Sequence, residues 1–318
     1  MILPILLIVF SLLLLFFGAE GLVRGSSSLA LRAGLSPLLV GLTIVAFGTS
    51  SPELVVSVKA ALAQQGDISL GNVVGSNSFN VGIILGLTAL ICPIPVHRQI
   101  IKLDAPIALG IAFVLLLFLY DKTLNRIEGL IFFIGIVAYT LMNVLLARRE
   151  ANKGSAADTK SEAESLTGIS NHWAIDVGFI LGGLVILVFG SRLLVDNSII
   201  LAKAFGVSEA IIGLTIVAAG TSMPELATSV VAALRKQPDI AIGNVVGSNV
   251  FNILGILGVA ALISPIHAPG ISLVDYATMI LFMVLLIPLL YTGQLLHRIE
   301  GVVLLMLYGV YLYILWPK

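Results

Sequence analysis

Apolar residues fall in long runs along this chain, and short polar breaks separate the runs. A run of about 20 apolar residues is long enough to cross a bilayer as a helix. Five such runs lie in the first half and five in the second: residues 2–23, 36–62, 70–92, 104–120 and 127–147, then 174–195, 208–234, 242–264, 273–292 and 299–316. No basic segment precedes the first run, so we expect a membrane helix there rather than a cleaved signal. The pattern predicts an all-α membrane protein with ten transmembrane helices.

The two halves repeat one another at a constant offset of 172 residues. Residues 41–53 read GLTIVAFGTSSPE, and residues 213–225 read GLTIVAAGTSMPE. Residues 70–80 read LGNVVGSNSFN, and residues 242–252 read IGNVVGSNVFN. Because each half has an odd number of predicted spans, the second copy must cross the membrane upside down relative to the first. The sequence therefore predicts two inverted five-helix repeats.

The segment between the repeats is charged and rich in small residues, which is typical of a flexible, solvated linker. We expect three parts: a first repeat at 1–147, the linker at 148–172 and a second, inverted repeat at 173–318. Eleven Lys and Arg residues fall on the linker side of the predicted spans and six on the other side. Since cytoplasmic loops are enriched in these residues, the linker should be cytoplasmic and both termini outside.

The composition supports a membrane protein and excludes several other classes. The chain is 58% hydrophobic and 11% charged, against roughly 25% charged in an average soluble protein. Its formal net charge is zero, so nothing indicates a nucleic-acid partner. Its one cysteine, Cys92, excludes an internal disulfide and a thiolate metal site.

Two carboxylates lie well inside the predicted spans, Glu53 and Glu225, at the same position of the repeat. A charged side chain at the bilayer centre costs at least about 2.5 kcal/mol, so such residues need a reason. The spans offer no Lys or Arg at that depth to neutralise them. Neighbouring Ser, Thr or Asn residues could satisfy a purely structural pair. The simplest neutralising partner is a transported cation.

A proline precedes each glutamate. Pro52 and Pro224 lack an amide donor and clash with the carbonyls of Gly48 and Gly220, so each helix should break there. Within a membrane, free carbonyls are tolerated where they face protein or a cavity, and discontinuous helices of transporters use them as ion ligands. Four hydroxyls beside the breaks add hard oxygen ligands: Thr49, Ser50, Thr221 and Ser222.

The second repeated block adds polar side chains at helical spacing. Ser76 and Asn80 are four residues apart and share one helix face, as do Ser248 and Asn252. The other asparagines of the block should form hydrogen bonds between helices: Asn72, Asn77, Asn244 and Asn249.

The candidate ligands are all oxygen atoms, which suits a hard cation such as Ca²⁺ with its 6–8 oxygen ligands. Zn²⁺ or Cu⁺ would require His or Cys. The four histidines fall in or near loops and are expected to be interfacial: His97, His172, His267 and His297.

With these residues in view, the chain resembles the calcium:cation antiporter superfamily, in its prokaryotic sodium/calcium exchanger branch. The resemblance rests on the paired blocks GTSSPE with GNVVGSNSFN and GTSMPE with GNVVGSNVFN, and it covers essentially the whole length. It implies ten helices and ion sites between helices 2, 3, 7 and 8. It also implies alternating access, in which helices 1 and 6 move against that core.

Carried over by position, the resemblance implies a calcium site made by Glu53 and Glu225 with the backbone carbonyls of Thr49 and Thr221. It implies flanking sodium sites made by Ala46, Thr49, Ser50 and Ser248 on one side and by Ser76, Ala218, Thr221 and Ser222 on the other, with Asn80 and Asn252 completing the centre. Exchangers of this type can carry Asp where this chain has Asn252, which leaves the driving ion open.

These observations predict a secondary antiporter that exchanges Ca²⁺ for Na⁺ across the inner membrane of a prokaryotic cell. It should need no cofactor besides the transported ions and should work as a monomer. A Ca²⁺/H⁺ antiporter and a K⁺-dependent Na⁺/Ca²⁺ antiporter remain alternatives on the same scaffold, and an ion channel is a further one. An intramembrane hydrolase would need a catalytic Ser–His, Asp–Asp or metal arrangement within the spans, and the sequence has none.

Overall fold

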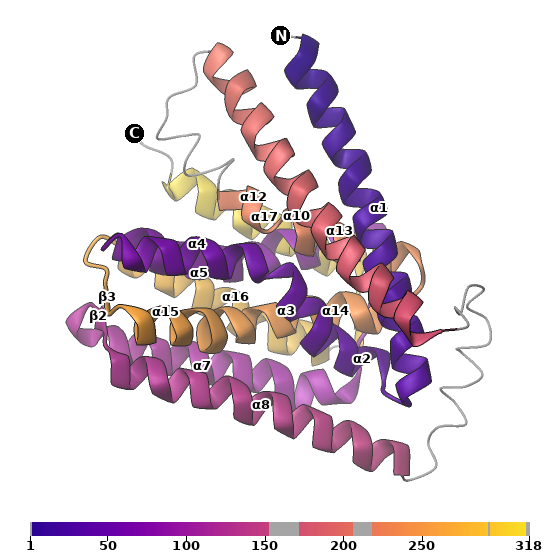
Figure 1. The fold of residues 1–318 in the computed structure, drawn as a ribbon. Helices are drawn as coiled ribbons and strands as arrows, with labels where there is room; N and C mark the ends of the chain where they lie inside the picture. The colour runs from indigo at the N-terminus through magenta and orange to yellow at the C-terminus, as the bar shows by residue number, and fades with distance from the viewer. Residues whose placement is uncertain (1, 153–171, 206–217, 292, 316–318) are drawn as a thin grey trace.

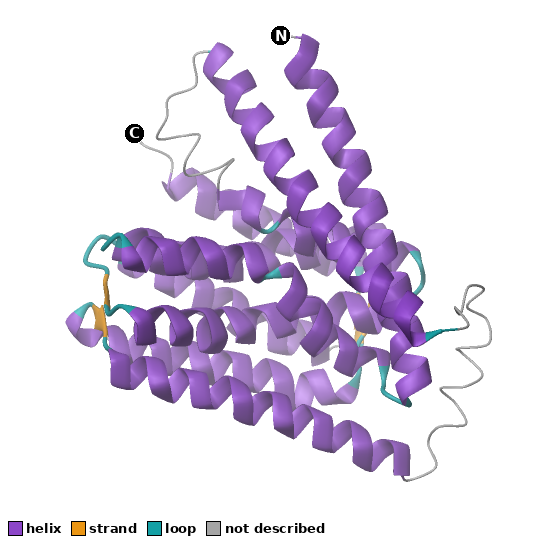
Figure 2. Cartoon of the chain, in the orientation of Figure 1, coloured by secondary structure: helices purple, strands orange, loops and turns teal. Residues whose placement is uncertain are grey.

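The computed structural model describes residues 2–152, 172–205, 218–291 and 293–315. These residues are almost entirely helical, and the strands are only two residues long (Figure 2). Eight helices in the described part are long and apolar enough to cross a membrane, or nine if the bent pair Pro37–Thr49 and Ser51–Leu62 is one span. The predicted all-helical membrane architecture is therefore confirmed, whereas the count of ten remains a prediction.

The first half runs from α1 to α8. Its elements are α1 (Ile2–Ala33), α2 (Pro37–Val40), η1 (Gly41–Val45), α3 (Ala46–Thr49), α4 (Ser51–Leu62), α5 (Gly66–Phe79), η2 (Asn80–Leu85), α6 (Gly86–Ile91), β1 (Ile94–Pro95), η3 (Ile100–Asp104), α7 (Ala105–Phe118), η4 (Leu119–Asp121), β2 (Thr123–Leu124) and α8 (Arg126–Asn152).

The second half repeats this order. Its described elements are α10 (Trp173–Ala204), α12 (Ala218–Thr221), α13 (Met223–Leu234), α14 (Pro238–Val250), η6 (Phe251–Leu257), α15 (Gly258–Ile263), β3 (Ile266–His267), α16 (Leu273–Tyr291), β4 (Leu295–Leu296) and α17 (Arg298–Leu315). The first part of the expected span 208–234 lies outside the described residues, as does most of the expected linker.

Two features differ from the predicted spans, and one predicted feature is confirmed. The helix expected at 2–23 continues to Ala33, and the one expected at 174–195 continues to Ala204. The span expected at 36–62 is bent by 47°. This bend confirms the predicted break. Several spans also contain π-helical turns, in which one extra residue widens the helix, and the hydropathy pattern carries no signal for these.

Two short strand ladders show how repeat-related helices run. β1, just before η3 and α7, pairs antiparallel with β4, which follows α16. β2, just after α7, pairs with β3, which precedes α16. The start of α7 therefore lies near the end of α16, and the end of α7 near the start of α16. These two equivalent helices, which are in contact, run in opposite directions.

A second repeat-related pair, α1 and α10, packs side by side at a steep angle to the remaining helices (Figure 1). A Cβ atom added at Gly18 would lie 2.9 Å from the amide nitrogen of Leu187. One added at Gly25 would lie 2.6 Å from the carbonyl oxygen of Asp176. The order of these contacts makes α1 and α10 antiparallel, and the missing side chains allow their backbones to approach closely.

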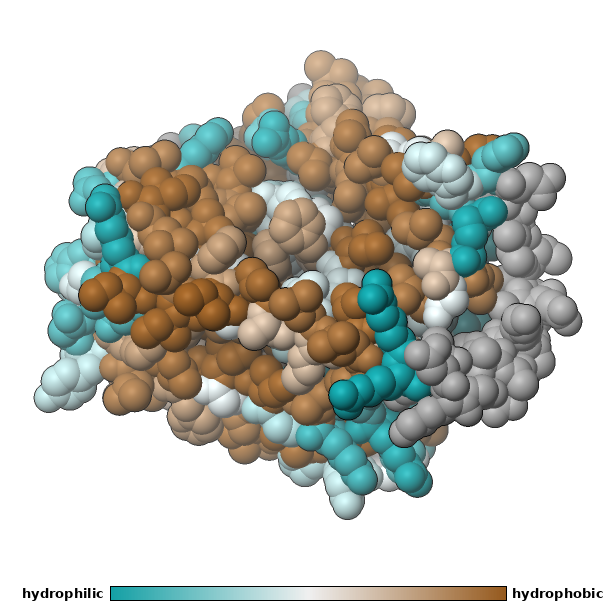
Figure 3. Space-filling view, turned by 60° about the horizontal axis from the view of Figure 1, so that its bottom comes forward, coloured by the Kyte–Doolittle hydropathy of each residue, from teal (hydrophilic) through white to brown (hydrophobic). Residues whose placement is uncertain are grey.

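Two spans form the centre of the molecule. In their most apolar windows, 83% of Pro238–Ile263 and 72% of Gly66–Ile91 is buried, against 22% of Ile2–Ala33. The second repeated block lies on these two central spans. Figure 3 shows apolar residues across the middle of one face and hydrophilic residues mainly toward its margins, as expected for a surface in contact with lipid.

Candidate cation-binding site

Each half contains a helix break immediately before its intramembrane glutamate. Ser50, between α3 and α4, has φ −82° and ψ 6°, and Ser222, between α12 and α13, has φ −88° and ψ 8°. These angles lie between the α and β regions. Pro52 and Pro224 occupy the first turn of the following helix, where a proline is tolerated but cannot continue the preceding helix. The sequence therefore breaks both helices at the same repeat position.

The two glutamates are held by hydroxyls from the opposite half. Glu53 and Glu225 are each 1% exposed and lie in the first turns of α4 and α13. Ser50 Oγ donates to Oε1 of Glu225 at 2.7 Å, and Ser222 Oγ donates to Oε1 of Glu53 at 3.0 Å. Each break thus contacts the carboxylate of the other, so the four residues form one cluster.

In each half, one asparagine links the glutamate helix to a central span. Asn72 Nδ2 donates to the Glu53 carbonyl at 3.2 Å and to Ser57 Oγ at 2.9 Å. In the other half, Asn244 Nδ2 donates to the Glu225 carbonyl at 3.3 Å and to Ser229 Oγ at 3.0 Å. These contacts confirm the predicted interhelical role of Asn72 and Asn244.

Two further asparagines orient Asn80 and Asn252 at the centre of the site. Asn80 Nδ2 donates to Asn249 Oδ1 at 3.0 Å, and Asn252 Nδ2 donates to Asn77 Oδ1 at 3.0 Å. Asn77 Nδ2 in turn donates to the Asn249 carbonyl at 3.3 Å. Because their amide nitrogens are engaged, Asn80 and Asn252 present their carbonyl oxygens as acceptors.

Five buried oxygen atoms of the predicted site have no hydrogen-bond partner among the described residues: Oε2 of Glu53, Oε2 of Glu225, Oδ1 of Asn80, Oδ1 of Asn252 and Oγ of Ser248. Leaving a buried polar atom without a partner costs about 1–3 kcal/mol, and more for a charged group. All five come from residues that the sequence singles out as cation ligands. Such a set of hard oxygens can bind a cation such as Ca²⁺ or Na⁺.

The other predicted residues lie around this cluster with their oxygen atoms partly engaged. Ser222 Oγ is 3.3 Å from Ser76 Oγ, which brings Ser76 to the Glu53 carboxylate. Thr49 Oγ1 lies 3.0 Å from Asn244 Oδ1, and Thr221 Oγ1 lies 3.5 Å from Asn72 Oδ1. The carbonyl of Ala46 accepts from the Ser50 amide at 3.0 Å. Ala218 begins α12.

The carbonyl of Gly220 accepts a hydrogen bond, although the sequence predicts that it is free. Ser191 Oγ on α10 donates to the Gly220 carbonyl at 2.5 Å, so a side chain takes the place of the amide that Pro224 lacks. The repeat-related residue of Ser191 is Ala19, which has no hydroxyl to offer. The expectation that Pro224 leaves the Gly220 carbonyl free is therefore wrong.

No basic side chain among the described residues balances the charges of the site. In the part of the chain that the structure describes, Lys and Arg pair with Glu20 and Asp176, and neither Glu53 nor Glu225 forms an ion pair. Nor do the described residues contain a group of three or more His, Cys, Asp and Glu side chains that could bind a metal. The site therefore depends on two carboxylates supplemented by neutral oxygens.

Two carboxylates near the ends of spans are buried, and the sequence did not predict this. Asp104 is fully buried at the start of α7 and accepts from Tyr139 Oη at 2.8 Å and Gln99 Nε2 at 3.1 Å. Asp176 is 1% exposed and pairs with Arg32 at 3.1 Å. Each stood at the boundary of a predicted span, and the signal that could have flagged it was an acidic residue flanked by apolar ones.

Comparison with known proteins identifies the family. A family model described as "Sodium/calcium exchanger protein" matches residues 3–145 and 175–316. The chain belongs to the sodium/calcium exchanger family. The resemblance drawn from the paired sequence blocks is confirmed.

Relatives match over most or all of their length. The chain is 38% identical over 322 residues to the putative antiporter CaxA of Alkalimonas amylolytica, covering 100% of both proteins. It is 38% identical over 284 residues to the inner membrane protein YrbG of Escherichia coli, covering 88% of this chain and 86% of that protein. It is 32% identical over 343 residues to the sodium/calcium exchanger MaX1 of Methanosarcina acetivorans, covering 98% of each.

The fold also matches solved structures. A structure of the sodium-calcium exchanger NCX_Mj soaked with 2.5 mM Na⁺ and 0.1 mM Ca²⁺ aligns with a TM-score of 0.84 and 29% identity, covering 100% of each chain. This chain is therefore a multi-pass transmembrane antiporter for cations, and its family consists of transporters rather than enzymes.

Proposed function

We propose that this antiporter exchanges Ca²⁺ for Na⁺ by alternating access. Both ions bind among the two broken spans, 37–62 and 218–234, and the two central spans, 66–91 and 238–263. One observation carries the proposal: Glu53, Glu225, Asn80 and Asn252 each have a buried oxygen without a partner among the described residues, and they come from symmetric positions in the two halves. In this proposal, these oxygens are the ligands of the transported ions.

Charge balance favours a divalent ion at the centre. Glu53 and Glu225 supply two formal negative charges when ionised, and a Ca²⁺ ion neutralises both. The Ca²⁺ ligands would be the two carboxylates with the backbone carbonyls of Thr49 and Thr221, and the amide oxygens of Asn80 and Asn252 would complete the centre. No described Lys or Arg competes with the ion for the two carboxylates.

Small hydroxyls around the carboxylates suit Na⁺. The flanking sodium sites would use Ala46, Thr49, Ser50 and Ser248 on one side, and Ser76, Ala218, Thr221 and Ser222 on the other. Ser50 and Ser222 already contact the carboxylates, and Ser248 has a buried Oγ without a partner among the described residues. When two or three Na⁺ replace one Ca²⁺, the membrane potential can act on any net charge moved, at about 2.3 kcal/mol per charge per 100 mV.

Proton-coupled exchange is the nearest rival, because two protons would also neutralise Glu53 and Glu225. Protons need no flanking oxygens, however, and the symmetric serines would then have no function in transport. A K⁺-dependent exchanger would require K⁺ in addition to Na⁺. A channel would conduct Ca²⁺ without a gradient of any second ion. The similarity to the sodium/calcium exchangers MaX1 and NCX_Mj favours sodium as the driving ion.

The position of α10 supports alternating access. A Cβ atom added at Gly48 would meet Leu184 of α10 at 2.7 Å, and one added at Gly220 would clash with Val195 of the same helix. These two residues lie about 16 Å apart along α10 at 1.5 Å per residue. α10 therefore borders both helix breaks, so a shift of the α1–α10 pair would change access to both sides of the site.

The proposal includes the organisation predicted from sequence. It comprises ten spans as two inverted repeats, at 1–147 and 173–318, around a cytoplasmic linker at 148–172. The antiparallel directions of α7 and α16, and of α1 and α10, support the inversion. The protein would act in the inner membrane, which its similarity to the inner membrane protein YrbG supports. It would act as a monomer and need no cofactor.

Flux measurements test this function directly. The purified chain is reconstituted in liposomes, and ⁴⁵Ca²⁺ uptake is followed under outward gradients of Na⁺, K⁺ or H⁺, imposed one at a time. We expect uptake with the Na⁺ gradient alone, and none in liposomes that carry the Glu53→Gln/Glu225→Gln variant. Full uptake driven by a pH gradient in Na⁺-free vesicles would favour the proton-coupled rival, and uptake without any gradient would favour a channel.

A further inference from the structure

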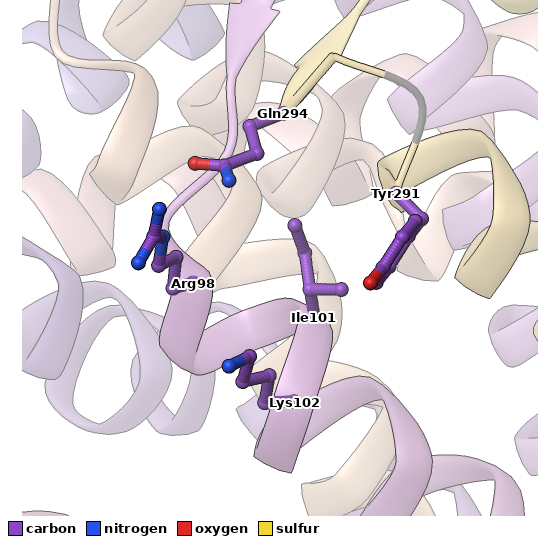
Figure 4. Close-up of a pocket in the computed structure, with 5 residues that line it drawn as sticks. All are labelled: Arg98, Ile101, Lys102, Tyr291 and Gln294. Carbon is purple, nitrogen blue, oxygen red and sulfur yellow. The ribbon is translucent and has the colours of Figure 1, made fainter.

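A basic pocket of about 280 Å³ lies at one end of the helix bundle, away from the cation site. Its lining consists of Arg98, Ile101, Lys102, Tyr291 and Gln294. Figure 4 shows Arg98 and Lys102 on consecutive turns of one helix, with Tyr291 and Gln294 across from them. Both halves of the chain therefore contribute to the pocket.

The strand ladder between the halves holds this pocket together. β1 pairs with β4, and the Val96 amide extends the ladder by donating to the Gln294 carbonyl at 2.8 Å. Arg98 lies three residues after the end of β1, and Gln294 directly precedes β4. The ladder thus places the segment that carries Arg98 beside the segment that carries Gln294.

Within the described residues, the two positive charges in the pocket have no counter-charge. Arg98 and Lys102 are exposed and form no ion pair with any residue in the described ranges. Asp104, the nearest acidic residue along the helix, is fully buried and accepts hydrogen bonds from Tyr139 and Gln99 instead. The pocket therefore offers two unpaired cations together with the hydroxyl of Tyr291 and the amide of Gln294.

The repeat shows that folding does not require these side chains. The related ladder of β2 and β3 exists at the other end, where the Ala268 amide donates to the Lys122 carbonyl at 2.9 Å. The positions related to Arg98, Lys102, Tyr291 and Gln294 are Gly270, Val274, Leu119 and Lys122. At that end a carboxylate is present, because Asp67 accepts from the Gly270 amide at 2.8 Å. Among the described residues, the related end of the scaffold therefore lacks the counterparts of Arg98 and Lys102.

The pocket lies where lipid headgroups would be. Spans Ile100–Asp121 and Arg126–Arg149 form a helical hairpin whose turn includes β2, so residues 98–102 lie at the end of the hairpin where the linker begins. Tyr291 is 70% exposed at the end of another span, a position typical of the membrane–water interface. Basic pockets between helices at this depth bind anionic headgroups.

We propose that this pocket binds the phosphate group of an anionic phospholipid in the leaflet on the linker side. Arg98 can form paired hydrogen bonds with phosphate oxygens, and Lys102 adds a second charge. Tyr291 and Gln294 donate to the remaining oxygens. The proposal does not depend on which ion drives exchange, so a failed cation site would leave it standing.

Lipid counting tests the proposal on the intact protein. Detergent-purified protein is equilibrated with equal amounts of phosphatidylglycerol and phosphatidylcholine, and bound lipids are counted by native mass spectrometry. We expect preferential binding of one phosphatidylglycerol. Lys102→Gln should weaken this binding about fivefold, and Arg98→Gln/Lys102→Gln should weaken it further. The charge-matched control is Lys59→Gln/Lys122→Gln, which removes two exposed cations outside the pocket and should retain the lipid.

Three results would overturn the proposal. One is unchanged phosphatidylglycerol binding in both pocket variants. Another is an equal loss in the control variant, which would indicate general charge attraction. The third is displacement of the lipid by excess inorganic phosphate at matched ionic strength, which would indicate a site for a small anion. Since Lys102 is exposed, the single variant keeps the test valid if the double variant is unstable.

Discussion

Ser50 Oγ donates a 2.7 Å hydrogen bond to Glu225, a residue 175 positions away in the other half of the chain. Ser222 and Glu53 form the reciprocal bond at 3.0 Å. Each helix break is therefore linked to the carboxylate that follows the other break. An ion that draws either carboxylate away from its serine would affect both halves at once, which links ion binding to the relative position of the two repeats.

The first prediction concerns the carboxylates. Glu53→Gln and Glu225→Gln should each abolish Ca²⁺ exchange, because one remaining charge cannot offset the dehydration of a divalent ion. The measurement is ⁴⁵Ca²⁺ uptake in proteoliposomes, with the amount of folded protein checked by gel filtration in detergent. Glu128→Gln, which changes a carboxylate that caps α8, is the control and should retain exchange. Substantial flux in either site variant would contradict a two-carboxylate site.

The second prediction concerns the serines that distinguish Na⁺ from H⁺ coupling. Ser76→Ala and Ser248→Ala should weaken the dependence of exchange on Na⁺, with a smaller effect on Ca²⁺ binding, because each removes a hydroxyl proposed to bind Na⁺. The measurement is the Na⁺ concentration needed for half-maximal Ca²⁺ efflux. Ser78→Ala is the matched control, since Ser78 Oγ already donates to the Val74 carbonyl of its own helix at 3.0 Å. Wild-type behaviour of both site variants, with exchange driven by pH alone, would favour proton coupling.

Much of the candidate site could be predicted because charge within an apolar span is rare and the repeat shows it twice. Glu53 and Glu225 stand out for this reason, and the asparagines follow from helical spacing. Hydropathy does not report which acceptor a side chain meets in three dimensions. The bond from Ser191 to the Gly220 carbonyl depends on the packing of α10 against α12, so it could not be predicted.

A departure from a regular helix could be predicted only where a single residue causes it. The bend at Ser50 follows from Pro52, but the π-helical turns η2 and η6, which include Asn80 and Asn252, have no such local cause. They form where packing favours an extra residue per turn, and such turns are frequent at functional sites. Asp104 was missed because the predicted span began at that residue, whereas η3 begins earlier, at Ile100.

The third prediction concerns topology. In a Cys92→Ser background, cysteines introduced by Ser155→Cys and by Lys318→Cys should react with impermeant reagents from opposite sides of the membrane. The linker position should be labelled from the cytoplasm and the C-terminal position from outside, because ten spans place the linker after five crossings and the end after ten. Labelling of both positions from the same side would refute the ten-span arrangement.

The fourth prediction concerns the contact between α1 and α10. Gly183→Ala should destabilise the protein and impair exchange, because the added Cβ would lie 2.6 Å from the Leu22 amide nitrogen. Overpacking of this kind typically costs about 1–3 kcal/mol. Gly182→Ala is the adjacent control, since its added Cβ would have no neighbour within 4 Å. Thermal unfolding in detergent should show a lower midpoint for the Gly183 variant only, and equal midpoints would mean that the helices do not pack this closely.

The last prediction separates an ion ligand from the residue that orients it. Asn249 Oδ1 accepts from Asn80 Nδ2 at 3.0 Å and so turns the Asn80 carbonyl oxygen toward the site. Asn249→Ala should therefore weaken Ca²⁺ binding, and groups that orient metal ligands typically change affinity about 10–100-fold. Asn80→Ala, which removes the proposed ligand itself, should weaken binding at least as much.

The double variant decides between orientation and general loss of structure. If Asn249 acts through Asn80, then Asn80→Ala/Asn249→Ala should bind Ca²⁺ no more weakly than Asn80→Ala alone, because nothing remains to be oriented. The measurement is isothermal titration with Ca²⁺ in Na⁺-free detergent, with thermal unfolding as a check on folding. Effects of the two substitutions that simply add would mean that Asn249 supports the helix packing and does not orient Asn80.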